Sequence, residues 1–297
     1  MKPANLRTRL KSPKIVLTPG VYDALTASLA EAAGFEAAYI SGAAIAYTRL
    51  GRPDIGLVSM VEVAETIQLV RDRVELPLIV DADTGYGNAL NVQRTVRLFE
   101  RSGANALQME DQTFPKRCGH LKDKSVIAAV EMVGKIKAAV DARKSEETLI
   151  IARTDAIAVN GFQDAIERAE MYREAGADML FIEAPGSQQQ LESLVGTFRD
   201  KIPLMANMVE GGLTPIRAAS ELEKIGYSLV IFPGAIVRAI SHAAREFYAT
   251  LHREGTTDSM RDRMFNLDSL NEMIGTPDML ELGKRYEEGL AREHDAA

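Results

Sequence analysis

Four stretches of the chain repeat one pattern, in which a glycine precedes a short apolar run by a few residues. They are Gly34-Phe-Glu-Ala-Ala-Tyr-Ile, Gly103-Ala-Asn-Ala-Leu-Gln-Met, Gly176-Ala-Asp-Met-Leu-Phe-Ile and Gly226-Tyr-Ser-Leu-Val-Ile-Phe. Glycine readily adopts the left-handed conformation that follows the last turn of many helices. An unbroken apolar run is typical of a parallel strand that is covered on both faces. Each stretch therefore predicts the end of a helix and the start of a buried strand.

Further apolar runs without such a glycine complete the set of eight candidate strands. They are Ile15-Val-Leu-Thr, Leu78-Ile-Val, Leu149-Ile-Ile-Ala and Leu204-Met-Ala. Helix-start signals lie in the intervals between the strands. Ser59 and Glu62 form a predicted capping box, and Asn91 is expected to cap a second helix. Thr214-Pro215 predicts an N-cap followed by proline at the first helical position.

This alternation of strands and helices predicts the fold class. Eight strands that alternate with helices favour an α/β fold of the (β/α)8 TIM-type barrel class. A doubly wound open sheet is the alternative. No low-complexity linker interrupts the chain, so we expect a single domain over residues 1–297. Within it, residues 255–297 are predicted to be a charged, C-terminal helical extension that could pack on a partner subunit.

Composition and charge narrow the class of partner. The net charge of −7 over 297 residues disfavours a nucleic-acid partner, because proteins that bind nucleic acid present a basic face. No run approaches the roughly 18 apolar residues of a membrane span. The N-terminus lacks the apolar segment of a signal peptide, and Cys118 is the single cysteine, so no intrachain disulfide can form. We therefore expect a cytoplasmic protein without a membrane partner.

Polar or ionisable residues follow six of the eight predicted strands. They are Ser41, the pair Asp81 and Asp83, Glu110, Arg153, Glu183 and Asn207. In a barrel of this class the carboxyl ends of the strands form the active site. These side chains are therefore expected to meet on one rim and to bind a small-molecule carboxylate.

The types of these residues predict their roles. Asp81, Asp83 and Glu110 are three acids on neighbouring strands, and carboxylate oxygens are ligands that Mg²⁺ prefers. The alternative is that Asp81 and Asp83 cap a helix or lie in a solvated turn; Asp111 and Asp155 could likewise be caps. Arg153 offers a planar, permanently charged fork for a substrate carboxylate. Glu183 could orient a hydroxyl group or accept its proton, and Asn207 offers an amide donor.

The loop Lys116-Arg-Cys-Gly-His120 follows the fourth strand and carries the only thiol. Positive neighbours lower the pKa of a thiol, which makes Cys118 a candidate proton donor and acceptor. Gly119 would let the loop fold over a ligand. A buried structural cysteine is the alternative, but the charged neighbours Lys116, Arg117 and His120 favour a functional thiol.

These motifs together resemble the isocitrate lyase and phosphoenolpyruvate mutase superfamily over roughly residues 15–290. The matching stretches are Tyr39-Ile-Ser-Gly42, Pro53-Asp54-Ile-Gly56, Val80-Asp-Ala-Asp-Thr-Gly-Tyr-Gly-Asn88, Glu110-Asp-Gln112, Lys116-Arg-Cys-Gly-His120, Ala152-Arg-Thr-Asp155 and Asn207-Met-Val-Glu210. Lys-Arg-Cys-Gly-His is typical of the lyase branch, with 2-methylisocitrate lyase and 2,3-dimethylmalate lyase. The carboxyphosphonoenolpyruvate mutase branch carries it too and shares the Asn-Met-Val-Glu-Gly-Gly run.

The resemblance implies a site and an assembly. It implies Mg²⁺, with Mn²⁺ as a substitute, at Asp81, Asp83 and Glu110, partly through water. It implies substrate-binding positions at Tyr39, Ser41, Gly42, Asp54, Gly119, Arg153, Asn207 and Arg238, of which Asp54 lies on a mobile loop. It implies catalytic positions at Cys118, Glu183, His120 and Lys116. It also implies paired barrels that exchange a helix, as a homodimer or homotetramer.

The activity that the resemblance implies is Mg²⁺-dependent cleavage of a carbon–carbon bond in a 2-hydroxy di- or tricarboxylate. The products would be pyruvate or another 2-oxoacid and a second carboxylic acid. Asn266 stands where the methylisocitrate branch tends to have a further arginine, which favours a smaller substituted malate. Candidates for the wall beside the substrate's substituent are Phe114, Leu121, Met208, Val209 and Ile236. The alternatives are a phosphonomutase, an oxaloacetate decarboxylase or hydrolase, and a non-catalytic binding protein.

Overall fold

Eight parallel strands close into a barrel in the computed structural model, which describes residues 5–119, 121 and 123–295. The strands are β1 (Val16–Val21), β2 (Ala38–Ile40), β3 (Leu78–Asp81), β4 (Ala106–Glu110), β5 (Leu149–Thr154), β6 (Met179–Ile182), β7 (Leu204–Asn207) and β8 (Leu229–Phe232). Each strand pairs with the next in sequence, and β8 returns to pair with β1. The predicted (β/α)8 barrel is confirmed, and the open sheet is not.

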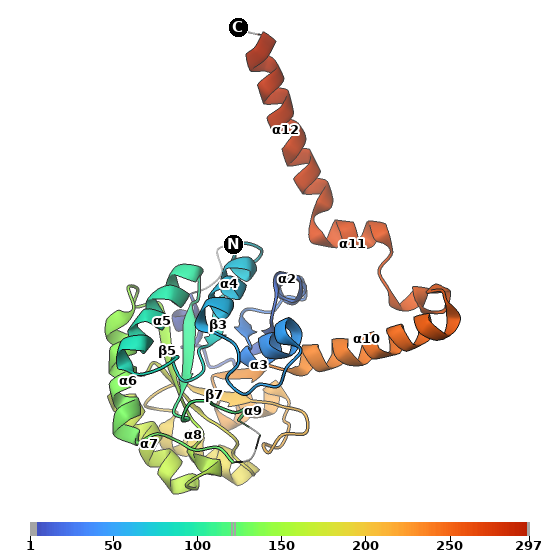
Figure 1. Cartoon of the computed structure of the whole chain (residues 1–297). Helices are drawn as coiled ribbons and strands as arrows, with labels where there is room; N and C mark the ends of the chain where they lie inside the picture. Colours follow the sequence, from blue (N-terminus) through green and yellow to red (C-terminus); the bar gives the residue numbers. More distant parts are fainter. Residues whose placement is uncertain (1–4, 120, 122, 296–297) are drawn as a thin grey trace. The chain divides into compact units, whose positions relative to one another are not determined.

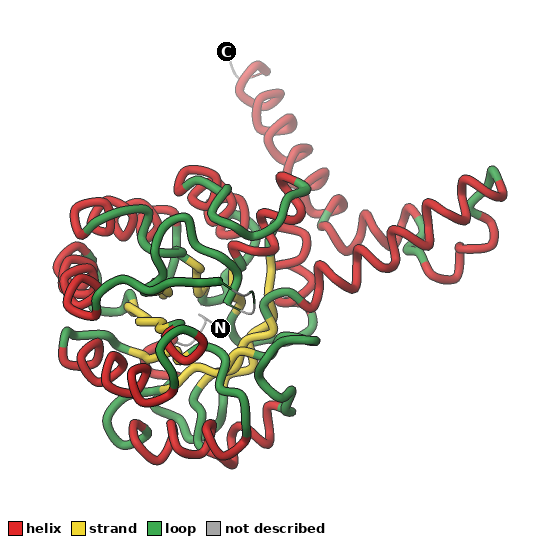
Figure 2. Tube along the Cα trace, turned by 60° about the horizontal axis from the view of Figure 1, so that its bottom comes forward, coloured by secondary structure: helices red, strands yellow, loops and turns green. Residues whose placement is uncertain are grey.

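Helices surround the strands, as Figures 1 and 2 show. They are α2 (Ala24–Ala32), α3 (Gly42–Ile45), α4 (Met60–Arg71), α5 (Ala89–Ser102), α6 (Ala129–Ala142), α7 (Phe162–Glu174), α8 (Gln188–Phe198) and α9 (Ala219–Ile225). Short helical turns follow α3 and β5, at Ala46–Leu50 and Ala156–Ala158. The barrel is preceded by the short helix α1 (Leu6–Arg9).

The core has two layers. Alternate strand residues point into the barrel, where Tyr39, Ile151 and Phe181 belong to one buried cluster. Leu6 of α1 joins this interior cluster. The other strand residues pack against the helices in a larger cluster that includes Phe99. Because the interior is filled by side chains, a ligand site is left only where the strands end.

The predicted helix ends are confirmed at all four glycines. Gly34, Gly103, Gly176 and Gly226 have positive φ angles of 85°, 107°, 103° and 118°. The capping box of Ser59 and Glu62 at the start of α4 is also present. These local signals fix the lengths of the helices and so place each following strand in the barrel.

Two predicted helix starts are wrong. Asn88, not Asn91, caps α5; Asn91 occupies the third helical position and accepts a hydrogen bond from the Asn88 backbone N–H at 3.1 Å. Helix α9 begins after Ala218, whose N–H donates to Glu221 Oε2 at 2.9 Å. This hydrogen bond from the cap residue to Glu221 satisfies the free N–H at the helix start, downstream of the Thr214-Pro215 signal.

The chain divides into two compact units, residues 1–238 and 239–297. The boundary falls within α10 (Ala235–Glu254), which is earlier than residue 255, where we expected the extension to start. The second unit continues through a turn at Asp258–Arg263, α11 (Leu267–Ile274) and α12 (Thr276–Asp295). Asn266 caps α11 there and accepts a hydrogen bond from Ser269 N. Among the described residues, no helix combines the length and apolar character needed to cross a membrane.

Candidate active site

Most of the predicted site residues surround one cavity of about 60 Å³ at the carboxyl ends of the strands. Those that line it are Tyr39, Ser41, Asp54, Asp81, Lys116, Cys118, Gly119, Arg153, Glu183, Asn207 and Arg238. Three other predicted residues do not line it: Gly42, Asp83 and Glu110. All three are buried. His120 lies outside the described residues. The cavity is also lined by Tyr47, Phe181 and Ile231, which were not predicted from the sequence.

Asp81 and Asp83 form one acidic corner of the site. Asp81 is the last residue of β3, and its Oδ1 accepts a hydrogen bond from the backbone N–H of Asp83 at 3.1 Å. Asp83 has a left-handed φ of 47°. Gly42 lies against this corner, because a Cβ there would stand 3.1 Å from Asp81 Oδ2 and 3.4 Å from Asp83 Oδ1. The glycine therefore allows the β2 loop to approach both carboxylates.

Glu110 is the least satisfied acid of the rim. Its side chain is 1% exposed, and neither carboxylate oxygen accepts a hydrogen bond from the described residues. Arg153 Nη1 lies 3.1 Å from Oε2 as an ion-pair partner. Burial raises the pKa of Glu110 well above its ordinary value, and Arg153 opposes that shift. A buried carboxylate with so few partners is costly unless a cation compensates it.

The acids fit a hard divalent cation that keeps much of its water. Within the residues that the structure describes, no group of three His, Cys, Asp or Glu side chains converges as a directly coordinated metal would require. Mg²⁺ commonly binds through one or two carboxylates and retains several water molecules. The partly unsatisfied oxygens of Glu110 and the close pair Asp81 and Asp83 provide such a donor set.

Lys116 is turned toward the acids. Its Nζ lies 2.6 Å from Asp54 Oδ1 and 2.8 Å from Asp83 Oδ1, and the side chain is buried. Burial acts to lower the pKa of Lys116, but the carboxylates of Asp83 and Asp54 outweigh it and raise the pKa well above the ordinary value. In the sequence, this positive charge lies two residues before Cys118. In the fold, two carboxylates engage it instead.

Arg153 is held by three carboxylates. Its Nε and Nη2 donate to the two oxygens of Asp155 at 2.9 and 3.1 Å. Nη1 reaches Glu110, and Nη2 lies 3.4 Å from Glu183 Oε2. The ring of Phe181 lies below the guanidinium, with Cζ 5.0 Å from its centroid. The arginine is thus rigidly oriented at the floor of the cavity.

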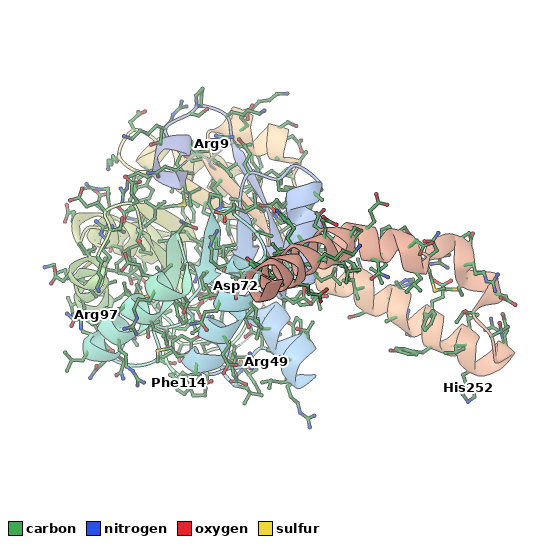
Figure 3. All side chains as sticks on the ribbon, turned by 90° about the horizontal axis from the view of Figure 1, so that it is seen from above. Arg9, Arg49, Asp72, Arg97, Phe114 and His252 are labelled. Atoms are coloured by element: carbon green, nitrogen blue, oxygen red, sulfur yellow. The ribbon has the colours of Figure 1, made fainter. Side chains whose placement is uncertain are left out.

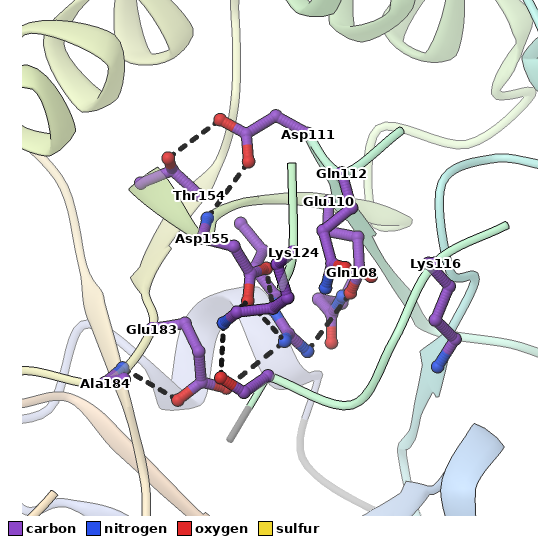
Figure 4. A network of polar contacts seen from close by, with 12 residues as sticks. Gln108, Glu110, Asp111, Gln112, Lys116, Lys124, Thr154, Asp155, Glu183 and Ala184 are labelled. Carbon is purple, nitrogen blue, oxygen red and sulfur yellow. Dashed lines mark hydrogen bonds and ion pairs between the residues drawn. The ribbon is translucent and has the colours of Figure 1, made fainter. Parts of the chain in front are cut away.

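Asp111 and Asp155 are not helix caps. Asp155 precedes the short turn after β5 without a capping hydrogen bond from its side chain. Asp111 is fully buried and accepts hydrogen bonds from Thr154 Oγ1 at 2.8 Å and Asp155 N at 3.0 Å (Figure 4). It also accepts one from Tyr172 OH at 2.7 Å. Arg168 Nη1 lies 3.3 Å from the same carboxylate. Asp111 therefore anchors the end of β5, and Asp155 orients Arg153.

Glu183 and Asn207 form the opposite corner. Glu183 Oε1 accepts from the backbone N–H of Ala184 at 2.8 Å, and Oε2 accepts from Asn207 Nδ2 at 3.0 Å. Asn207 Oδ1 is buried and takes no hydrogen bond from the described part of the chain. This corner can therefore present both an acid and an amide oxygen to a polar ligand.

The loop that carries Cys118 lies over Arg153 and Glu183. The Cys118 backbone N–H donates to Asp54 O at 3.2 Å, which joins this loop to the one that carries Asp54. A Cβ on Gly119 would stand 2.3 Å from Arg153 Nη2 and 2.8 Å from Glu183 Oε2. Only glycine fits this close approach. The half-buried thiol of Cys118 lines the same cavity.

The proposed apolar wall is only partly present. Val209 lines the cavity, but Phe114 is 65% exposed at the outer surface of the barrel (Figure 3), and Leu121 is 47% exposed. Met208 is buried in the larger core cluster. Ile231 and Phe181, which lie in strands and face inward, supply apolar surface instead. At the rim, Arg238 pairs with Glu210.

A closed parallel barrel with acids, an arginine and a thiol at the carboxyl ends of its strands belongs to the class of (β/α)8-barrel enzymes. Residues 6–252 match the model of the phosphoenolpyruvate phosphomutase family. The chain belongs to this family.

Curated relatives include two lyases. The chain is 39% identical over 288 residues to the 2,3-dimethylmalate lyase of Eubacterium barkeri, covering 96% of this chain and 98% of that protein. It is 43% identical over 295 residues to the 2-methylisocitrate lyase of Aeropyrum pernix, with coverage of 98% and 94%.

Solved structures agree with this placement. A 2,3-dimethylmalate lyase superposes with a TM-score of 0.90 at 33% identity, covering 96% of this chain and 95% of the other. An oxaloacetate acetylhydrolase in complex with 3,3-difluorooxalacetate gives 0.89 at 33%, with coverage of 96% and 97%. A phosphonopyruvate hydrolase in complex with oxalate and Mg²⁺ gives 0.86 at 31%, with coverage of 96% and 99%. The family and these neighbours indicate a divalent metal.

Proposed function

We propose that this chain is a Mg²⁺-dependent carbon–carbon lyase that cleaves a 2-hydroxy di- or tricarboxylate. The products are pyruvate, or another 2-oxoacid, and a second carboxylic acid. The observation that carries this proposal is the convergence of Arg153, Glu183 and Cys118 on one cavity beside three buried acids. The lyase relatives support the same reaction class.

Asp81, Asp83 and Glu110 are the residues that would hold Mg²⁺, with water completing its shell. When bound, the metal supplies Lewis-acid stabilisation of negative charge on the 2-oxoacid oxygens. Mn²⁺ is a substitute with the same preference for oxygen ligands. The ammonium of Lys116 neutralises Asp54 and Asp83 at the edge of this cluster and keeps the two loops together.

The remaining residues bind and orient the substrate. Ser41 and Gly42 offer hydroxyl and backbone groups to the 2-oxoacid part, and Tyr39 closes the cavity from inside the barrel. The fixed guanidinium of Arg153 faces the carboxylate, since Asp155 holds it in one orientation. Asn207, Gly119, Arg238 and His120 would bind the second carboxylate or the hydroxyl group.

Proton transfer falls to Glu183 and Cys118. Glu183, acting through a water molecule, would remove the substrate's hydroxyl proton, after which the carbon–carbon bond breaks. The electron pair passes to the departing fragment, and Cys118 donates a proton to its carbon. Cys118 can take this role because it lies on the loop over Arg153, opposite the floor of the cavity.

A substituted malate is the substrate that we favour. Ion pairing with Glu210 restrains Arg238, the one arginine that the resemblance assigns to a second carboxylate. Asn266 replaces a further arginine of the methylisocitrate branch. Both features disfavour a third carboxylate. We further propose a cytoplasmic enzyme in which helices of residues 239–297 are exchanged between paired barrels of a dimer or tetramer.

A coupled assay tests this function. Pyruvate release with Mg²⁺ would be followed by lactate dehydrogenase for 2-methylisocitrate, 2-methylmalate, 2,3-dimethylmalate and oxaloacetate. We expect strong turnover of one hydroxy acid. Pyruvate from oxaloacetate alone would instead indicate a decarboxylase, and oxalate with acetate would indicate the hydrolase reaction. If none of these compounds releases pyruvate and a phosphonate is turned over, the proposed lyase activity is wrong and a phosphonomutase is indicated.

A further inference from the structure

The loop from Lys116 to Lys124 is held at each end by a buried lysine. Lys116 contacts Asp54 and Asp83 beside the acidic corner. Lys124 contacts Asp155, and the side chains of that pair are 2% and 0% exposed. The first contact belongs to the site described above. The second has no part in the proposed chemistry, although it is equally buried.

Lys124 connects the loop to the carboxylate that orients Arg153. Its Nζ lies 2.8 Å from Asp155 Oδ1 and also donates to the backbone carbonyl of Gly119. Asp155 at the same time accepts two hydrogen bonds from the Arg153 guanidinium. One carboxylate thus joins the arginine at the floor of the cavity to the loop that covers it (Figure 4).

The contact is made at a residue that packs directly against the site. Gly119 approaches Arg153 and Glu183 so closely that a Cβ would overlap both. Cys118 is the preceding residue, so the position of the Gly119 carbonyl sets the position of the thiol. A lysine that fixes this carbonyl relative to Asp155 therefore fixes the thiol relative to Arg153.

We propose that Lys124 is a positioning residue, which seats the Cys118 loop by linking the Gly119 carbonyl to Asp155. This inference rests on the proposed function, in which Cys118 and Arg153 act on one substrate. The contact is charge-assisted and shielded from water, so it is among the stronger kinds of hydrogen bond. Lys124 is distinct from a core residue, because without it Asp155 remains paired with Arg153 and the barrel interior is unchanged.

The test uses Lys124→Met, which removes the charge and keeps the length of the side chain, and Lys124→Arg, which can still bond two oxygens. Lys137→Met is the matched control, because Lys137 is exposed on α6. Cys118 is the only cysteine, so alkylation by iodoacetamide reports this loop alone. Each protein is alkylated with and without oxalate and Mg²⁺, and kcat and KM are measured on the best substrate.

We expect Lys124→Met to speed alkylation by about tenfold or more, because local opening controls access to a partly buried group. We expect kcat to fall on the order of 10- to 100-fold with little change in KM, since the thiol is misplaced rather than lost. Lys124→Arg should restore most of both readouts, and Lys137→Met should match the wild type.

Unchanged alkylation and kcat in Lys124→Met would overturn the proposal, as would equal losses in Lys124→Arg. If the methionine variant does not fold, Lys124→Gln, which removes the charge but keeps a donor, is expected to show the same changes to a smaller extent. Faster alkylation in a protein that cleaves no hydroxy acid would uphold the role of Lys124 in seating the loop and reject the proposed reaction. The two failures are therefore distinguishable.

Discussion

Buried carboxylates on two sides of the barrel rim differ in the number of hydrogen bonds that they accept. On the β3–β4 side, Glu110 is buried with oxygens that accept no hydrogen bond from the described residues. Toward β5, Asp155 after that strand and Asp111 after β4 are equally buried, and each accepts several hydrogen bonds. Buried polar groups without partners are costly, whereas a satisfied network makes the structure rigid. In the function that we propose, the first side binds the ligand, and the second is a support that holds Arg153.

Removal of the metal should cause the largest loss of turnover, and it should act through the acids on the β3–β4 side alone. Treatment with a chelator should lower turnover by at least about 10³-fold, because a Lewis acid supplies several kcal/mol of transition-state stabilisation. Activity should return with Mg²⁺ or Mn²⁺. The measurement is initial rate against free metal concentration. Full activity in the chelator would show that the acids on the β3–β4 side need no metal, and it would contradict the comparison of the two sides.

Asp111→Ala should weaken the buried hydrogen-bond network around β5 and leave the ligand site intact. The substitution leaves Tyr172, Thr154 and Arg168 without their shared acceptor, and loss of one partner of a buried ion pair costs about 3–5 kcal/mol. We expect a loss of that size in the free energy of unfolding, measured with urea. Glu110→Gln is the matched variant on the other side and should retain or raise stability without metal while abolishing turnover. Equal losses in both variants would contradict the comparison.

Cys118→Ser leaves the carboxylates on both sides of the rim unchanged. It tests the thiol on the loop over the cavity. Turnover should fall by at least about 10²-fold, because a positioned acid or base contributes 10²- to 10⁴-fold. Oxalate binding in the presence of Mg²⁺ should persist, since the acids and Arg153 are intact. Calorimetry with oxalate serves as the control. Turnover near that of the wild type would exclude Cys118 as the proton donor.

The smallest expected effect is on the pH dependence of the unfolding free energy, and it arises at Asp155, which holds Arg153. Burial acts to raise the pKa of Asp155, but Arg153 and Lys124 outweigh it and lower the pKa below the ordinary value. An acid with a lowered folded-state pKa stabilises the fold above its unfolded pKa of about 3.9, and this contribution is lost as pH falls through the folded value. Unfolding free energy below about pH 4 should therefore decline less steeply in Asp155→Asn than in the wild type. Identical slopes would show that Asp155 makes no such contribution.

The fold could be predicted from the sequence because the signals for helix ends and strands are local. Glycines at helix ends and apolar runs depend on a few neighbouring residues, and Gly103 or Gly226 could be read without knowledge of the rest. The errors were of the same local kind: Asn88 and Asn91 both suit a cap, and only the reciprocal hydrogen bond decides between them.

Positions at the strand ends were predictable from barrel topology, whereas the lining residues Asp54, Gly119 and Arg238 followed from the family resemblance. Asp81, Glu110 and Arg153 stand at such ends, and barrel topology brings them together. Lys124 lies in a charged stretch, Lys-Asp-Lys, that is typical of a solvated loop. Its buried contact with Asp155 depends on how the loop folds back. Phe181 could have been found, since it pairs in register with Arg153 on the neighbouring strand and shares its inward direction.

The closing pair of strands has a consequence for when this site can exist. Val16 of β1 pairs with Leu229 of β8, so the ring is completed by residues more than two hundred positions apart. The residues around the cavity run from Tyr39 to Arg238 in the chain. During synthesis, the first acids emerge long before the strand that closes the ring. These residues therefore meet in a closed barrel only after β8 has been made, and a chain that ended before β8 would hold the acids without the ring that brings them together.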